Sequence, residues 1–235
     1  MMAICKREFR SNFLSPLGYV FCGVMLLLFG IYYFQVLMTQ SSDYIPQIYS
    51  MLFSWIMVIV LPIITMRSFS EEIRNKNDQG LLTAPVSVTG IVAGKFLASF
   101  FTFAIALTAT LIPAVVITFF SSPDWAMIFA SYFGSLLCGA AMIAVGNFIS
   151  SLTQSQVVAA IATFGTSLLL MMIGQFSGSI SNQFLSNLFT WISFDSRYQP
   201  FTKGILNLSS IVFFLSAAVV FLFLTARKLE SKRWS

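Results

Sequence analysis

The sequence predicts an all-α integral membrane protein with six transmembrane helices, an N-terminal amphipathic helix at the interface, and both termini in the cytoplasm. Of its 235 residues, 57% are hydrophobic and 9% are charged, whereas a soluble domain carries about 25% charged residues. Uncharged segments recur with at least the roughly 20 residues that a helix needs to cross the hydrocarbon core. Lys and Arg residues are also distributed unevenly between the two sides of the resulting topology.

The apolar segments define six spans within one transmembrane domain that covers residues 1–235. The predicted spans are 17–38, 50–67, 92–120, 126–149, 156–177 and 205–226. The fourth and fifth spans come from one uncharged run, which we divide at Ser150–Gln156. Hydroxyl and amide side chains suit the interface better than the bilayer centre, so the chain is expected to turn there.

The basic residues orient these spans. With a cytoplasmic N-terminus, the outside holds only Arg197 and Lys203, and the other 11 of the 13 Lys and Arg residues lie inside. The role of these residues in orienting the spans explains the net charge of +5 without a nucleic-acid partner. We therefore expect a multi-pass protein of the cell (inner or cytoplasmic) membrane that contacts lipids and binds no nucleic acid.

Residues 3–15 are predicted to form the interfacial helix. On a helical projection Met2, Cys5, Phe9 and Phe13 share one face, and the basic side chains lie away from it. The side chains expected to anchor the protein at the cytoplasmic interface are Lys6, Arg7, Phe9, Arg10 and Lys95. A basic anchor that only fixes the topology is the alternative.

The segment 68–91 is the longest polar stretch and is cytoplasmic by the charge distribution. Glu71 and Glu72, followed by Arg74, suit a short helix, and the stretch continues through Leu81-Leu82 to Pro85. Two leucines beside a carboxylate pair favour contact with a partner protein over a plain solvated connector, which is the alternative.

The segment 178–204 is too polar to cross the membrane and too apolar to float free. Its apolar residues recur at helical spacing, so we expect a helix on the outer leaflet with Trp191 at headgroup depth. It either caps an outward-facing cavity or serves only as an anchor.

Several chemistries are excluded by the residues. The chain has no histidine, which removes Ser-His, Cys-His and His-ligated metal mechanisms. Gly90 and Gly94-Lys95 do not form a phosphate-binding loop, because only three residues separate the glycines and Phe96 follows the lysine. We expect no catalytic site, no metal site and no cofactor bound by this chain.

No charged residue lies near a predicted bilayer centre, although ion-coupled carriers normally need one. Energy for any transport is therefore expected from another subunit. The polar residues Asn147 and Gln175 either line a path or, as is more common, form hydrogen bonds between helices.

Three stretches together resemble the membrane subunit of an ABC-2 type transporter. They are Lys6-Arg7-Glu8-Phe9 with Ser15–Tyr19, the segment Arg67–Lys95, and Phe194-Asp195 with Gln199–Gly204. The third stretch is most similar to the gliding-motility-type subgroup. Asn77-Asp78 and Gly80 depart from the family pattern, which commonly has Gly-Thr and a Glu there.

This resemblance implies a coupling mechanism. Two membrane subunits would face each other above two ATPase subunits that bind ATP and Mg. The segment 68–91 would act as a coupling helix on the ATPase, through Glu71, Glu72, Arg74, Leu81, Leu82 and Pro85. The second subunit would be another copy or a related chain, and an exported auxiliary membrane protein would accompany a gliding-type role. A membrane scaffold or assembly factor is the main alternative, and an intramembrane enzyme lacks a nucleophile.

Overall fold

The computed structural model describes residues 2–39, 48–50, 56–75, 87–119, 122–177 and 182–233. All regular elements within these ranges are helices. The helices are α1 (Met2–Leu14), α2 (Pro16–Thr39), η2 (Ile56–Val60), α4 (Leu61–Thr65), α5 (Ser70–Arg74), α7 (Val88–Ala109), α8 (Leu111–Ile117), α9 (Trp125–Leu152), α10 (Gln156–Ser177), α11 (Gln183–Ile192), α12 (Phe194–Thr202) and α13 (Leu208–Arg233).

Five helical segments of the described chain are long and apolar enough to cross a membrane, which confirms a multi-pass all-α protein. They are Pro16–Gln35, Val88–Ile117, Trp125–Leu152, Gln156–Gly174 and Leu208–Ser231. Most of the predicted span 50–67 is described as η2 and α4, but residues 51–55 lie outside the described ranges. The sixth span therefore stays a prediction.

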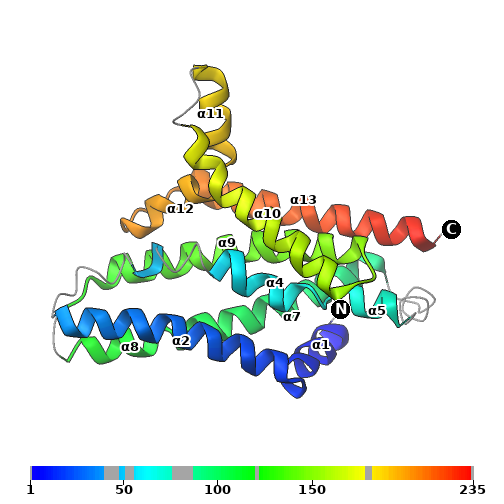
Figure 1. Ribbon diagram of the computed structural model, residues 1–235, viewed down its shortest axis with the longest axis horizontal. Helices are drawn as coiled ribbons and strands as arrows, with labels where there is room; N and C mark the ends of the chain where they lie inside the picture. Colours follow the sequence, from blue (N-terminus) through cyan, green and yellow to red (C-terminus); the bar gives the residue numbers. More distant parts are fainter. Residues whose placement is uncertain are drawn as a thin grey trace.

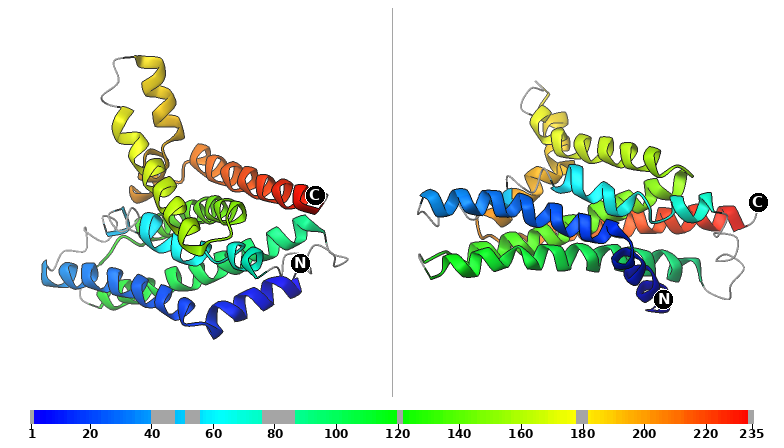
Figure 2. Two further views of the ribbon diagram at one scale, coloured as in Figure 1. Left: turned by 45° about the vertical axis from the view of Figure 1, so that its right-hand side comes forward. Right: turned by 60° about the horizontal axis from the view of Figure 1, so that its bottom comes forward.

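The long helices run side by side, and both termini lie at one end of the bundle, the terminal end (Figure 1). The further views place α1 and the end of α13 at that same end (Figure 2). A shared end agrees with an even number of crossings, and its assignment to the cytoplasm stays a prediction.

Helix α9 is the centre of the bundle. It packs against α4, α7, α10, α12 and α13, and 72% of its span is buried, against 22% in α10 and α13. Small residues allow these close approaches: a Cβ atom at Gly139 would overlap the ring of Phe103, and one at Gly146 would overlap Thr65. The remaining long helices direct most of their apolar surface outward.

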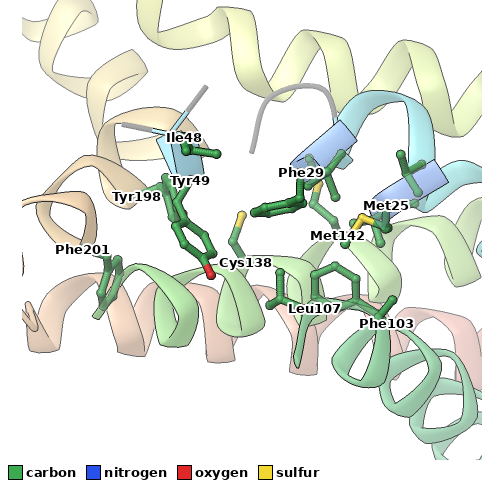
Figure 3. Close-up of a cluster of buried hydrophobic side chains, with 14 of the residues drawn as sticks. Met25, Phe29, Ile48, Tyr49, Phe103, Leu107, Cys138, Met142, Tyr198 and Phe201 are labelled. Atoms are coloured by element: carbon green, nitrogen blue, oxygen red, sulfur yellow. The ribbon is translucent and has the colours of Figure 1, made fainter. Parts of the chain in front are cut away.

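Apolar and aromatic side chains fill the interior around α9. Figure 3 shows part of this core, in which side chains from α2, α7, α9 and α12 point toward one another. The labelled members are Met25, Phe29, Ile48, Tyr49, Phe103, Leu107, Cys138, Met142, Tyr198 and Phe201.

Helix ends follow from particular residues. Pro113 has no N–H to donate to the carbonyl of residue 109, and the helix is interrupted there, between α7 and α8, at Thr110. Asp124 caps α9, because its carboxylate accepts from the N–H groups of Ala126 (2.9 Å) and Met127 (3.3 Å). The chain leaves α9 after Leu152 and enters α10 at Gln156, within the polar stretch where we divide the fourth and fifth predicted spans.

Helix α11 lies across the direction of the spans and projects sideways from the bundle (Figure 1). Its exposed side chains include Phe184, Leu185, Leu188 and Trp191. This orientation suits a helix that rests on a membrane surface, although the depth of Trp191 stays a prediction.

The close packing at α9 leads to a prediction on stability. Gly139→Ala forces the Phe103 ring to move, so we expect a loss of about 1–3 kcal/mol in the free energy of unfolding. Gly165→Ala is the matched control, because a Cβ atom there meets no atom within 4 Å and alanine favours a helix over glycine by about 1 kcal/mol. Unfolding of both variants in mixed micelles measures the difference. Equal stability of the two would contradict the packing described here.

Candidate functional site: an ionic cluster that joins three helices

Lys95 lies two turns inside α7, and its side chain is only 2% exposed. Helix α7 begins at Val88, and the Ser87 hydroxyl accepts from the N–H of Gly90 (3.2 Å) to cap it. The cap fixes where the helix starts and therefore where Lys95 points. A buried ammonium group needs acceptors for all its protons.

Three acceptors surround the Lys95 ammonium group. Its Nζ atom lies 2.7 Å from the carbonyl oxygen of Ser68, 3.0 Å from a carboxylate oxygen of Glu72, and 3.3 Å from a carboxylate oxygen of Glu8. The ammonium also lies 5.2 Å from the centre of the Phe69 ring. Each proton can therefore be directed to one acceptor, although the side chain is almost completely removed from solvent.

Arg7 completes the arrangement from the exposed side. Its Nη2 atom lies 2.8 Å from Glu8 and 3.1 Å from Glu72. The ionic cluster, defined as Arg7, Glu8, Glu72 and Lys95, thus joins α1, α5 and α7. Next to it, the Asn12 amide of α1 donates to Thr102 of α7 (3.4 Å), so the two helices are tied at two levels.

Helix α5 is held in place by the end of α9. The Ser150 hydroxyl oxygen accepts from the N–H groups of Phe69 and Ser70 (both 3.1 Å), and the hydroxyl donates to the Met66 carbonyl (3.1 Å). The opposite side of the helix is apolar, where Phe69 and Ile73 pack with residues of α7 and α13. Polar and apolar contacts together fix α5, although it has only five residues.

The two neighbouring glutamates face different partners. Glu72 enters the ionic cluster, and its side chain is 17% exposed. Glu71 pairs instead with Arg67 one turn earlier on the chain, where both side chains remain about one third exposed. Such surface pairs contribute roughly 0.5 kcal/mol or less, whereas the buried cluster costs several kcal/mol when one partner is removed.

A cavity of about 500 Å³ opens beside these groups. Its lining includes all four residues of the ionic cluster together with Arg67 and Glu71. Three cationic and three anionic side chains therefore share the cavity, and their formal charges cancel.

The environment shifts the pKa values of the two clustered carboxyl groups in opposite directions. Burial raises the pKa of Glu72 above its ordinary value of 4.5, and the nearby Lys95 ammonium offsets this only in part. Burial acts in the same direction on Glu8, but Lys95 and Arg7 outweigh it and hold the pKa of Glu8 below 4.5. Of these two carboxylates, Glu8 therefore stays ionised to the lower pH.

The predicted site residues are distributed over several places. Arg7, Glu72 and Lys95 meet in the ionic cluster, and Lys95 lies beneath α1 rather than at an exposed interface. Lys6, Arg10 and Arg74 are exposed at the terminal end, and Phe9 is half-buried against Phe13 (ring centroids 5.0 Å apart). Leu81, Leu82 and Pro85 lie outside the described residues.

Of the two polar residues predicted within the spans, the structure describes the side chain of Asn147 but not that of Gln175. Asn147 is completely buried in α9, and neither of its amide atoms has a hydrogen-bond partner within the described part of the chain. Such an unsatisfied group costs about 1–3 kcal/mol. Whether Asn147 lines a path or bonds to another helix stays a prediction. Gln175 belongs to α10, and its side chain lies outside the described set.

Sequence reasoning missed three contributors, namely Glu8, Arg67 and Ser150. Glu8 directly follows Lys6-Arg7, precedes Arg10 by two positions, and lies one turn from Cys5 on the inner face of α1. A single carboxylate on the inner face of a basic helix is a signal that could have indicated a buried cationic partner. The role of Ser150 had no such signal, because a serine near a helix end most often faces solvent.

A family model described as "ABC-2 family transporter protein" matches residues 2–232. The chain belongs to the ABC-2 transporter family. As an ABC-2 protein it is a membrane component of a transporter, and members of this family normally work with ATPase subunits. A search of curated proteins finds no match. The matched model identifies the family and not a subgroup, so the gliding-type assignment stays a prediction.

Removal of the central cation should destabilise the protein. Lys95→Met removes the buried cation and leaves Glu8 and Glu72 with only the exposed Arg7 between them, so we expect a loss of about 3 kcal/mol in the free energy of unfolding. Arg67→Met, which breaks only the exposed pair with Glu71, should cost roughly 0.5 kcal/mol or less. Mixed-micelle unfolding compares the two variants, and equal losses would show that the buried cluster does not stabilise the fold.

The opposite pKa shifts predict that Glu8 and Glu72 change the stability of the protein in different pH ranges. Glu8 has a lowered folded-state pKa, so the stability it contributes is present above pH 4.5 and is lost as the pH falls below that value. Glu72 has a raised folded-state pKa, so the folded state takes up a proton above pH 4.5, and acidification there relieves the cost of burying its charge.

Thermal unfolding in detergent at several pH values tests this division. We expect Glu8→Gln to remove part of the loss of stability below pH 4.5, and Glu72→Gln to alter the profile above it. The reverse assignment would mean that the two carboxylates do not differ as the geometry indicates.

Proposed function

We propose that this chain is the permease subunit of an ATP-driven ABC-2 transporter, in which the segment around α5 docks on a cytoplasmic ATPase. The observation that carries this proposal is the ionic cluster. It connects α5 to the buried Lys95 of α7 and to α1. A displacement applied to α5 would therefore act on a span and on the interfacial helix together.

A second connection leads from α5 to the centre of the bundle. Because Ser150 bonds to both Phe69 and Ser70, a shift of α5 also acts on the end of α9. Helix α9 packs against five other helices, and packed elements of this kind move between discrete arrangements rather than deforming gradually. Closure of the ATPases would thereby change access to a path along the membrane subunits.

The distribution of charge supports an external source of energy. No charged residue occurs between Lys95 and Asp124, or between Asp124 and Asp195. A carrier driven by an ion gradient would normally place an ionisable group in such a span. In the proposed complex, ATP and Mg are bound by the ATPase, and this chain binds no cofactor.

A second permease subunit would complete the transporter. The spans of α2, α10 and α13 are only 28%, 22% and 22% buried, which leaves apolar surface for lipid and for a second copy or related chain. Apolar walls favour an amphiphilic substrate. Export, or work on a gliding-type machinery with an exported auxiliary protein, is supported only by the resemblance of residues 194–204.

The proposal predicts that docking and transmission can be separated by mutation. Arg74 is exposed at the end of α5, so Arg74→Ala should weaken retention of the ATPase several-fold when the complex is purified. Glu72 faces inward, so Glu72→Gln should leave the ATPase bound but reduce stimulation of its activity in proteoliposomes. Co-purification and ATP hydrolysis measure the two effects.

Lys228→Gln on α13 is a matched control, because this exposed side chain lies at the same end of the bundle but outside the site. Loss of ATPase retention in the control as well as in Arg74→Ala would indicate a general charge effect. If no ABC-type ATPase accompanies the chain when it is purified from its own membrane, the scaffold alternative replaces this proposal.

A further inference from the structure

The outward side of α1 carries a groove that the ionic cluster does not occupy. This basic groove has a volume of about 610 Å³ and is lined by Ala3, Lys6, Arg7, Arg10, Ser11 and Leu14. Three of its six lining residues are cationic, and none of the six is acidic. Arg7 is paired with Glu8 and Glu72, but no acidic residue of the lining balances Lys6 and Arg10, in contrast to the cavity on the inner side of α1.

The groove also has an apolar end. Leu14 is 74% exposed at the point where α1 ends, and α2 begins two residues later at Pro16. A ligand that extends from Arg7 and Arg10 past Leu14 would run from a charged surface toward the start of a membrane span. This order of charge followed by apolar surface matches a phospholipid, with its phosphate against the cations and its acyl chains toward the bilayer.

Arg7 belongs to both sides of α1. It lines the basic groove and the inner cavity, and its side chain is 57% exposed while Nη2 contacts Glu8 and Glu72. The guanidinium group has five N–H donors, so a phosphate in the groove has access to the same side chain that holds the cluster. The carboxylates of Glu8 and Glu72 and a phosphate in the groove would therefore bind the same guanidinium group.

We propose that the basic groove binds the phosphate of an anionic phospholipid, and that this headgroup competes with Glu8 and Glu72 for Arg7. Binding of lipid and pairing of Arg7 with Glu72 then weaken each other to the same extent, because coupling between two binding events is reciprocal. The lipid would thereby loosen the tie between α1 and α5. This inference concerns lipid binding by the chain itself and does not depend on the proposed ATPase.

Binding is tested with the full-length chain in phosphatidylcholine nanodiscs that contain spin-labelled phosphatidylglycerol. The measured quantity is the selectivity of the protein for this lipid over spin-labelled phosphatidylcholine. Each cation near an anionic surface contributes about 1 kcal/mol, or about fivefold, so Lys6→Gln combined with Arg10→Gln should reduce the selectivity by at least that factor. Lys203→Gln combined with Lys228→Gln removes the same charge elsewhere on exposed positions. An equal reduction in this control would overturn the site.

The competition is tested by the neighbouring glutamates. Glu72→Gln removes the negative charge that pairs with Arg7, so it should raise the affinity for phosphatidylglycerol about two- to fivefold. Glu71→Gln is the matched control, because Glu71 pairs with Arg67 and not with Arg7, and it should leave the affinity unchanged. If the two variants behave alike, Arg7 is not shared in the way proposed.

Two additions identify the occupant. Inorganic phosphate lacks the apolar part and should not displace the spin-labelled lipid, and efficient displacement would show a site for free anions instead. An ATPase subunit added to the nanodiscs should also leave the lipid bound. Loss of lipid selectivity on its addition would assign the groove to an acidic protein surface and overturn the lipid site.

Discussion

The terminal end of the bundle depends on one buried ammonium group. Lys95 is 2% exposed and has an acceptor for each of its three protons, drawn from Glu8, Ser68 and Glu72. Without these acceptors a charge at this depth would cost several kcal/mol. Since the acceptors come from α1, from α5 and from Ser68 just before α5, the burial of one α7 side chain fixes the positions of three helices. Because a buried charge that loses one of its partners is strongly destabilising, the cluster is expected to stay fully paired.

The centre of the molecule is organised by a different constraint, which is shape. Helix α9 has small residues where its neighbours come closest, so Phe103 of α7 and Thr65 of α4 approach its backbone directly. Its final turn then offers the Ser150 hydroxyl to the start of α5. Helix α9 therefore links close packing in the spans with the polar contacts at the terminal end.

The fold was largely predictable because the bilayer restricts the choices. Spans must be long, apolar and helical, so composition alone indicated α2, α7, α9, α10 and α13, and the polar stretch Ser150–Gln156 indicated where α9 gives way to α10. The interruption at Thr110 was not predicted, although Pro113 supplies its physical cause. The sixth span depends on residues 51–55, which the structure does not describe.

The candidate site was only partly predictable, because helical spacing describes one helix at a time. Glu71 and Glu72 are adjacent in the sequence and had been assigned the same role, yet they face opposite environments. The difference arises because successive residues on a helix are rotated by about 100°. Which of the two faces inward depends on where α5 starts, and Ser150, far away in the sequence, contributes to that choice. Long-range partners of this kind leave no periodic pattern for a sequence to display.

The two ends of the molecule hold their cations in different ways. At the end opposite the termini, Arg197 of α12 lies over the rings of Trp191 and Phe213 (5.1 and 5.4 Å) and donates to Ser209 (2.8 Å). Aromatic faces accept a cation over a range of positions, whereas a buried ion pair depends on close, directional contacts. The contacts of Arg197 are therefore less directional than those of Lys95, and the firm attachment of α12 comes instead from its packing on α9, where the buried Tyr198 hydroxyl lies 2.8 Å from that of Ser135. Ionic contacts thus fix the helices at the terminal end, whereas close packing on α9 fixes them at the other end.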